Sequence, residues 1–204
     1  MRELLAAADG VRLLGADYWR DFDENFWSTG PSGFWKVERL QRFREPGDES
    51  WVAFAGGDWE KALALLQARR PSLAGYRDRL RAQGFENRRV RVVEPPLNAY
   101  LQWELHLLLL RDEYGARTRV LDAEHVRPLE SDGVLPELVV LGDEVVYELL
   151  YDQDGLQEGG IRFTRPELVA RARELVAGLY ARAEDITAYF QREVAVLEPP
   201  VRSG

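Results

Sequence analysis

Side chains that hold metals or attack carbonyl groups are scarce in this chain. The 204 residues include two histidines and no cysteine. His106 lies in a helical pattern, but position 110 is leucine, so the two-histidine arrangement that binds zinc on a helix is absent. No glycine-rich phosphate loop and no Gly-x-Ser-x-Gly nucleophile motif occurs either. We therefore expect His106 to be structural, and we predict no metal site and no cofactor.

A polar site is nevertheless predicted where a strand meets a helix. Tyr100 and Glu104 are four residues apart and share one helix face, which neighbouring leucines place near the buried side. A carboxylate in such surroundings needs a partner, because burial otherwise raises its pKa. Arg91, on the preceding strand, is the expected partner. Two interpretations stay open: a Glu–Arg pair that ties helix to sheet, or a ligand-binding pocket bordered by Arg91, Glu94, Tyr100 and Glu104.

A strand–helix–strand pattern positions these residues. Charged and β-branched residues alternate over 89–93, and two prolines end that strand. Leucines then recur at helical spacing between Asn98, the expected N-cap, and Gly115, the expected C′ residue. A second strand follows over 118–121. Three such elements within about thirty residues predict a βαβ unit with two parallel neighbouring strands.

The other predicted elements surround this unit. They are a strand over 34–43 that forms a hairpin with 50–54, a helix capped by Asp58, a helix over 71–83, a hairpin of 138–141 with 144–151, a strand over 160–163, and one long helix from a Thr164 cap to Phe190. Together they predict an α/β fold, with α+β as the alternative, in which a mixed sheet carries an antiparallel hairpin and a long C-terminal helix. Three regions are expected: an N-terminal helical and aromatic extension over 1–33, a single α/β domain over 34–196, and a flexible tail over 197–204.

Composition excludes several classes of protein. An apolar content of 46% is typical of a chain with a packed core rather than a disordered one. The net charge of −8 makes a nucleic-acid partner unlikely, since such proteins usually present a basic face to phosphates. No apolar run is long enough for a signal peptide or a membrane span, so we expect no membrane contact. Without cysteine, the expected location is cytoplasmic.

A resemblance to a known family covers roughly residues 76–190 and rests on the motif at 89–104. The strand end Arg-Val-Arg-Val-Val-Glu-Pro-Pro-Leu, followed by Asn-Ala-Tyr-Leu-Gln-Trp-Glu, resembles the signature of an actinobacterial family of unknown function. Members are commonly encoded beside helix-turn-helix regulators of the Xre type. Ala99 and Gln102 replace the aspartate and arginine that are usual there. The resemblance implies an association with a regulator and no established activity.

A weaker resemblance concerns residues 135–146. Their hydrophobic rhythm and Asp-Glu turn are similar to a strand of the phospholipase D superfamily. Leu135, Glu137 and Gly142 stand where that superfamily has its catalytic histidine, lysine and aspartate. The resemblance therefore implies a degenerate phospholipase D-like half domain that lacks the nucleophile.

These observations favour a non-catalytic accessory module that senses a small molecule or contacts a regulator protein. The alternative is an enzyme built on carboxylates and arginines that acts on a phosphorylated or nucleotide-like substrate. In that alternative, Asp122, Glu124 and Asp143 on the predicted loops would hold a divalent cation. We favour the first hypothesis because the residue sets for nucleophilic or zinc chemistry are missing.

Overall fold

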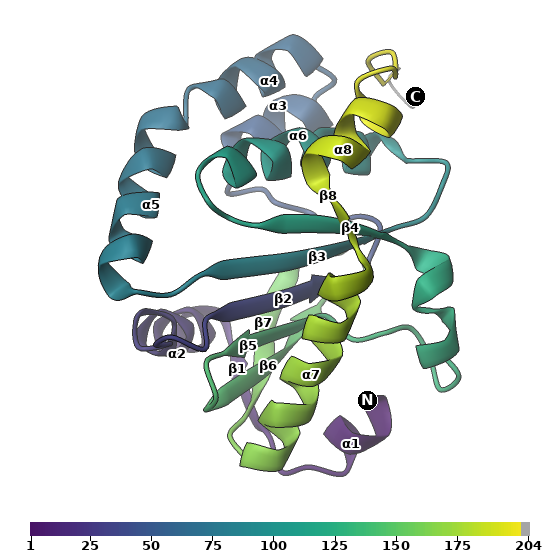
Figure 1. Cartoon of the computed structure of the whole chain (residues 1–204). Coiled ribbons are helices and arrows are strands. Elements are labelled where there is room, and N and C mark those ends of the chain that lie inside the picture. Colours follow the sequence, from purple (N-terminus) through teal and green to yellow (C-terminus); the bar gives the residue numbers. More distant parts are fainter. Residues whose placement is uncertain (201–204) are drawn as a thin grey trace.

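The computed structural model describes residues 1–200, and one mixed sheet runs through them (Figure 1). The strand order in this part of the chain is β1-β7-β6-β5-β2-β3-β4-β8. The strands are β1 (Val11–Leu14), β2 (Phe34–Glu38), β3 (Asn87–Val93), β4 (Thr118–Asp122), β5 (Leu138–Leu141), β6 (Val145–Tyr151), β7 (Gln157–Phe163) and β8 (Glu184–Asp185). β2, β3 and β4 are parallel to one another, and the other neighbours pair antiparallel. The predicted α/β class with a mixed sheet is confirmed.

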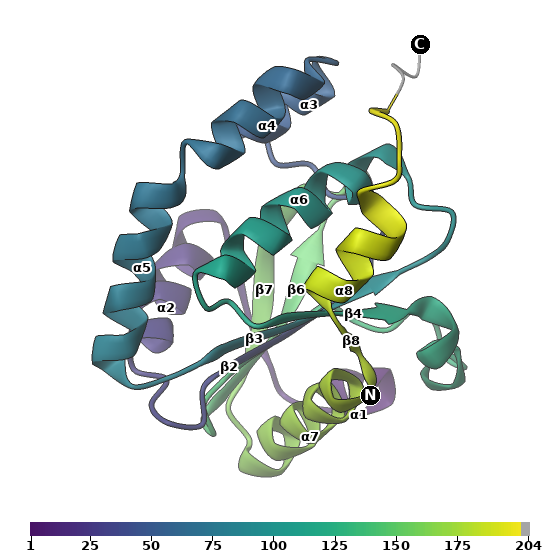
Figure 2. The ribbon, with the colours of Figure 1, turned by 45° about the horizontal axis from the view of Figure 1, so that its top comes forward.

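Helices cover both faces of the sheet (Figures 1 and 2). They are α1 (Arg2–Ala6), α2 (Gly15–Trp27), α3 (Glu49–Ala55), α4 (Trp59–Gln67), α5 (Arg70–Gln83), α6 (Ala99–Glu113), α7 (Pro166–Arg182) and α8 (Ile186–Tyr189), with 3-10 turns at Ala123–His125 and Arg127–Leu129 and a π-helical turn at Phe190–Val194. α7 lies across one face, whereas α2, α5 and α6 lie on the other. None of the helices described is long and apolar enough to cross a membrane.

The central βαβ unit forms as predicted. β3 and β4 are parallel neighbours, joined by α6. Asn98 Oδ1 caps the helix by accepting a hydrogen bond from the backbone N–H of Leu101 at 2.8 Å. Gly115 follows the helix with φ of 88°, a left-handed conformation that glycine adopts without strain. Local capping signals therefore locate both ends of α6.

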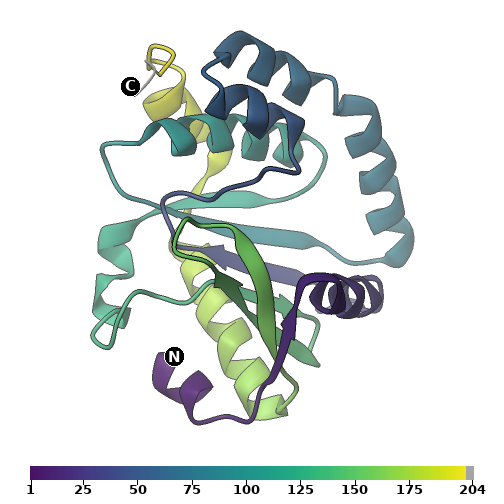
Figure 3. The same cartoon turned by 180° about the vertical axis from the view of Figure 1, so that it is seen from behind.

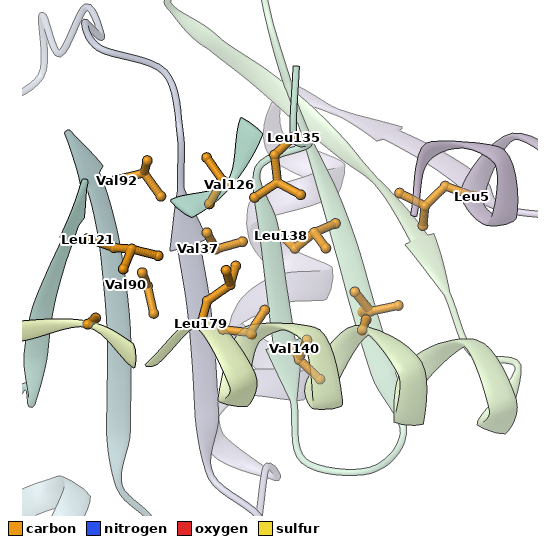
Figure 4. Close-up of a cluster of buried hydrophobic side chains, with 14 of the residues drawn as sticks. Leu5, Val37, Val90, Val92, Leu121, Val126, Leu135, Leu138, Val140 and Leu179 are labelled. Carbon is orange, nitrogen blue, oxygen red and sulfur yellow. The ribbon is translucent and has the colours of Figure 1, made fainter. Parts of the chain in front are cut away.

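The two faces of the sheet carry different residues. Under α7, buried apolar side chains from five neighbouring strands, β4, β3, β2, β5 and β6, contact the helix, and we call this the apolar face (Figure 4). Its sheet residues include Val37, Val90, Val92, Leu121, Leu138 and Val140. On the opposite side the same strands present Lys36, Glu38, Arg89 and Arg91 toward α6, and we call this the charged face. Successive strand residues point to opposite faces, so each strand contributes to both.

The predicted hairpin between 34–43 and 50–54 is wrong. Residues 50–54 belong to helix α3, not to a strand. Asp48 caps this helix, because its Oδ1 accepts the backbone N–H groups of Ser50 and Trp51 at 2.8 and 3.0 Å. The aromatic and β-branched residues of this segment suggested a strand, but the cap and burial against α4 outweigh that preference.

Strand β2 is also shorter than predicted, since it ends at Glu38. The carboxylate of Glu137 accepts hydrogen bonds from the backbone N–H groups of Arg39 and Leu40, both at 2.6 Å. Those two donors are therefore engaged by a side chain rather than by a neighbouring strand. A side-chain acceptor almost a hundred residues away in the sequence ends the strand.

A long C-terminal helix is present, but its predicted extent from a Thr164 cap to Phe190 is wrong. α7 begins with Pro166 after Arg165, rather than after a Thr164 cap, and ends at Arg182. Two residues then pair antiparallel with β4 as β8, and Asp185 caps α8 by accepting the backbone N–H of Thr187 at 2.9 Å. Apolar residues keep helical spacing across this break, so periodicity alone did not reveal it.

The N-terminal segment takes part in the sheet. β1 pairs antiparallel with β7, and Figure 3 shows it beside α2 at the rear of the molecule. α2 packs aromatic side chains on the sheet, with Tyr18 and Phe26 buried. The proposed boundaries at 1–33, 34–196 and 197–204 stay a prediction. Within the last range, residues 201–204 lie outside the described part, and the carbonyl oxygen of Glu198 accepts a hydrogen bond from Gln102 Nε2 at 2.9 Å.

Candidate functional site

Arg91 and Glu104 meet at the centre of the charged face. Arg91 Nε lies 2.7 Å from Glu104 Oε2, and Arg91 Nη1 donates to the carbonyl oxygens of Glu38 and Val92 at 3.3 and 3.1 Å. The two paired residues are 0% and 4% exposed. Arg91 Nη2 is buried without a hydrogen-bond partner in the described chain. The pair joins α6 to β3, as the structural interpretation of the sequence anticipated.

Tyr100 lies one turn before Glu104 on the same face of α6. Its hydroxyl group donates a hydrogen bond to Glu45 Oε1 at 2.6 Å. Glu45 belongs to the connection between β2 and α3, a segment far from α6 in the sequence. Tyr100 therefore connects the helix to the loop that covers the charged face.

Glu94 does not join the other three predicted residues. Its side chain is half exposed, and its carboxylate lies 2.6 Å from Arg39 Nη2. Arg39 also forms an ion pair with Glu130. Its backbone N–H donates to Gln41 Oε1 at 2.8 Å. The structure thus brings Arg91, Tyr100 and Glu104 together and directs Glu94 toward the rim of the molecule.

Sequence reasoning missed the carboxylate at the centre of the charged face. Glu38 on β2 lies 2.7 Å from Lys36 Nζ and 2.6 Å from Arg89 Nη1, and it is 4% exposed. Parallel pairing sets Lys36 beside Arg89 and Glu38 beside Arg91. The available signal was the alternation of Lys36 and Glu38 with apolar residues on β2, which places both charges on one face.

A cavity of about 130 Å³ opens beside these ion pairs. Glu38, Arg89, Tyr100, Glu104 and Arg111 are among the residues that line it. Arg111 lies two turns beyond Glu104 on α6, so both side chains point to the same side of the helix. Its guanidinium group forms no hydrogen bond or ion pair within residues 1–200. Arg111 is attracted by Glu45 and Glu38 without a direct ion pair to either, so within residues 1–200 a cation with no carboxylate in contact borders the polar cavity.

Burial and neighbouring charges shift the pKa values of these groups in different directions. Burial alone would raise the pKa of Glu38, but Arg89 and Lys36 outweigh it and hold that pKa below its usual range. Burial raises the pKa of Glu104, an effect that Arg91 reduces. The pKa of Tyr100 is raised by burial and by the charge of Glu104. Burial and the charge of Arg89 lower the pKa of Arg111.

Glu137 is a further buried carboxyl group on this side of the sheet. One oxygen accepts the two backbone hydrogen bonds that end β2, whereas the other, Oε2, has no partner in the described chain. Burial and the charge of Glu38 raise the pKa of Glu137 to about 7. This carboxyl group therefore titrates near neutral pH.

The cation site of the alternative hypothesis, at Asp122, Glu124 and Asp143, does not form among the described residues. Asp143 forms an ion pair with Arg173, Glu124 forms one with Arg127, and Asp122 Oδ1 accepts the backbone N–H of Glu124 at 2.8 Å. Residues 1–200 contain no group of three or more histidine or acidic side chains placed to hold a metal ion. Asp122 and Glu124 lie together at the end of β4, whereas Asp143 lies in the turn between β5 and β6, and each carboxylate is engaged in the contact just described.

His106 packs between aromatic rings. Its ring centroid lies 5.5 Å from that of Trp59 and 4.8 Å from that of Phe190. Burial lowers its pKa, so the neutral form is favoured at neutral pH. These contacts join α6 to α4 and to the C-terminal π-helical turn.

Fold and site define an α/β protein in which a mixed sheet holds a cluster of buried ion pairs beside a polar cavity. The chain belongs to the family with a domain of unknown function called DUF6879, whose model matches residues 20–191. None of the curated proteins and none of the solved structures matches it. The family match spans the charged face but leaves β1 outside its limits.

Proposed function

We propose that the chain is a non-catalytic accessory module that senses a small anionic molecule at the charged face. The observation that carries this proposal is Arg111, which borders the cavity and forms no direct ion pair or hydrogen bond among the described residues. Arg89 and Arg91, by contrast, are each paired with a carboxylate. An unpaired guanidinium group beside a polar cavity favours an anion, because charge-assisted hydrogen bonds are the strongest it can form.

The paired groups support a binding role rather than proton transfer. Glu38 is held ionised by Arg89 and Lys36, so it acts as a fixed charge near neutral pH. Arg91 is also fixed, because the carboxylates of Glu104 and Glu38 outweigh the effect of burial and raise its pKa. The resemblance to a degenerate phospholipase D-like half domain agrees with this role. Leu135 and Gly142 stand where that superfamily has its catalytic histidine and aspartate, and neither side chain can take part in that chemistry.

We further propose that the module acts in the cytoplasm and transmits its state to a regulator protein. Apolar side chains are exposed near the edge strand β1: Val11 is 49%, Leu14 45% and Trp19 54% exposed. The outer edge of β1 has no neighbouring strand within the described chain. A strand edge and exposed apolar residues together suit a protein partner.

A thermal-shift screen of metabolites tests this proposal. We expect an anionic metabolite to raise the melting temperature of the native chain, because a ligand that binds only the folded state stabilises it. Arg111→Gln should abolish the shift, whereas Arg171→Gln, an exposed arginine on α7, should retain it. A pull-down tests the partner surface, and Trp19→Ser should capture fewer proteins than the native chain because it removes an exposed apolar side chain beside β1. If no metabolite shifts the melting temperature and the variant captures the same proteins as the native chain, the proposal fails.

One observation favours the second candidate, an enzyme that acts on a phosphorylated or nucleotide-like substrate through carboxylates and arginines. Glu45 lines the same cavity as Arg111, and burial raises its pKa, which suits a general acid or base. Turnover of phosphate esters by the native chain that disappears in Glu45→Gln would establish it. Equal background rates in both proteins would remove it.

A further inference from the structure

A second and larger cleft adjoins the polar cavity. It has a volume of about 440 Å³ and lies where α2 and α5 meet the sheet. Lys36, Arg89, Arg111 and Gln157 line both spaces, so the cleft and the cavity meet at these side chains. The volume falls within the range of roughly 300 to 1,000 Å³ that is common for small-molecule sites.

One end of the cleft is aromatic. Phe22 and Trp27 of α2 and Tyr76 of α5 line it, and Phe34 of β2 also contributes. The rings already pack on one another: Trp27 and Tyr76 are 6.2 Å apart between centroids, and Phe22 stacks on Phe26 at 5.7 Å. Such a wall offers flat apolar surface to a planar group.

The other end of the cleft is positively charged. Lys36 and Arg89 share the single carboxylate of Glu38, and Arg111 forms no direct ion pair within residues 1–200. The carboxylate that lines the cleft itself, Asp23, lies at the α2 end and accepts a hydrogen bond from Trp27 Nε1 at 3.0 Å. The sheet end of the cleft therefore has an excess of positive charge.

A buried amide lies beside the aromatic end, where Asn87 pairs with Phe34. Asn87 of β3 is 8% exposed and lines the cleft, and its Nδ2 donates to the hydroxyl group of Tyr76 at 3.4 Å. Its Oδ1 has no hydrogen-bond partner in the described chain. A buried acceptor without a donor costs free energy that a ligand N–H or O–H group recovers.

We infer that this cleft binds a planar aromatic ring that carries an anionic group, a carboxylate or a phosphate. The ring packs against Phe22 and Trp27, and the anion lies between Arg111 and Arg89. A donor on the ring reaches Asn87. The inference rests on the proposed ligand-sensing function and gives its ligand a chemical class.

Calorimetry with matched probes tests the need for both ring and charge. Indole-3-carboxylate is compared with indole-3-carboxamide, and adenosine monophosphate with adenosine, so that the two arms separate carboxylate from phosphate. Acetate and inorganic phosphate serve as anions without a ring. In at least one arm, we expect the ringed anion to bind about tenfold or more tightly than its neutral analogue and than its ringless anion.

Three variants assign the contacts. Arg111→Gln should weaken binding of the ringed anion about tenfold or more and leave the neutral analogue unchanged. Phe22→Leu should weaken both, because it removes ring contact rather than charge. Arg171→Gln, at an exposed position of α7, the helix that covers the apolar face, should change neither. Far-ultraviolet circular dichroism checks that each variant is folded.

Two results would overturn the inference. The first is that no ringed anion binds below about 1 mM. The second is that acetate or phosphate binds as tightly as its ringed counterpart. In either case, a thermal shift by a non-aromatic metabolite that Arg111→Gln abolishes would leave the proposed function standing. If, in addition, no metabolite shifts the melting temperature of the native chain, both the inference and the proposed function are removed.

Discussion

The apolar face and the charged face are built from alternate residues of the same strands. On β2, Val37 packs under α7 while Lys36 and Glu38 face α6, and on β3 Val90 and Arg91 divide in the same way. The apolar face is closed by side chains of the α7 layer, whereas the charged face borders two cavities. The apolar face is therefore a closed packing surface, whereas the charged face combines buried ion pairs with open space.

The largest loss of stability is expected when one partner of the buried ion pair on the charged face is removed. Arg91→Met leaves Glu104 buried without a counter-ion, and we expect a loss of about 4 kcal/mol in the free energy of unfolding. The double variant Arg91→Met with Glu104→Leu should recover much of this loss, because it removes the unpaired charge. Urea denaturation measures both, and equal instability of the single and double variants would contradict this account.

The apolar face should respond to a cavity rather than to a charge. Leu179 on α7 is fully buried, and Leu179→Ala should lower the free energy of unfolding by roughly 3 kcal/mol. Binding of an anion at the charged face should keep its affinity at temperatures where the variant is folded. A large change in that affinity would show that the two faces are coupled.

A pH series should distinguish the faces by titration. Because the pKa of Glu137 rises from 4.5 to about 7 on folding, its contribution to stability is fully present below the unfolded value and is lost as pH rises through 7. The native chain should lose roughly 3 kcal/mol by this route between the unfolded and the folded pKa, and Glu137→Gln should lack that part of the slope. Superimposable pH profiles for the two proteins would contradict the assignment.

The smallest effect is expected for an ion pair outside both faces. Arg70 Nη1 lies 2.6 Å from Glu113 Oε2, but both side chains are more than 40% exposed. Water and salt screen such a pair, so Arg70→Ala should leave the midpoint of urea denaturation unchanged within error. A shift as large as that of Arg91→Met would show that burial is not what distinguishes the charged face.

The βαβ unit could be predicted because its signals are local. Asn98, Gly115 and the leucine spacing lie within one short stretch, and the pairing of Arg91 with Glu104 followed from the rule that a buried carboxylate needs a cation. Glu94 was placed with them, but the chain turns outward after the strand and directs its side chain to Arg39.

Long-range pairing explains what could not be predicted. Glu38 and Arg89 are 51 residues apart in sequence and meet only because β2 and β3 pair in one particular register. Arg111 did leave a signal, since it follows Glu104 by seven residues on one helix face. The strand assigned to 50–54 overlooked a cap at Asp48 that was legible in the sequence.

Strand β1 makes the N-terminal residues part of the sheet, because it pairs with β7. It covers one edge of β7, and Gly160 leaves space there for Tyr18, since a Cβ atom would lie 2.9 Å from the tyrosine ring. A chain shortened to the residues that the family match covers would begin at 20 and leave β7 with an open hydrogen-bonding edge. Open edges recruit other strands, so such a fragment would tend to self-associate through β7.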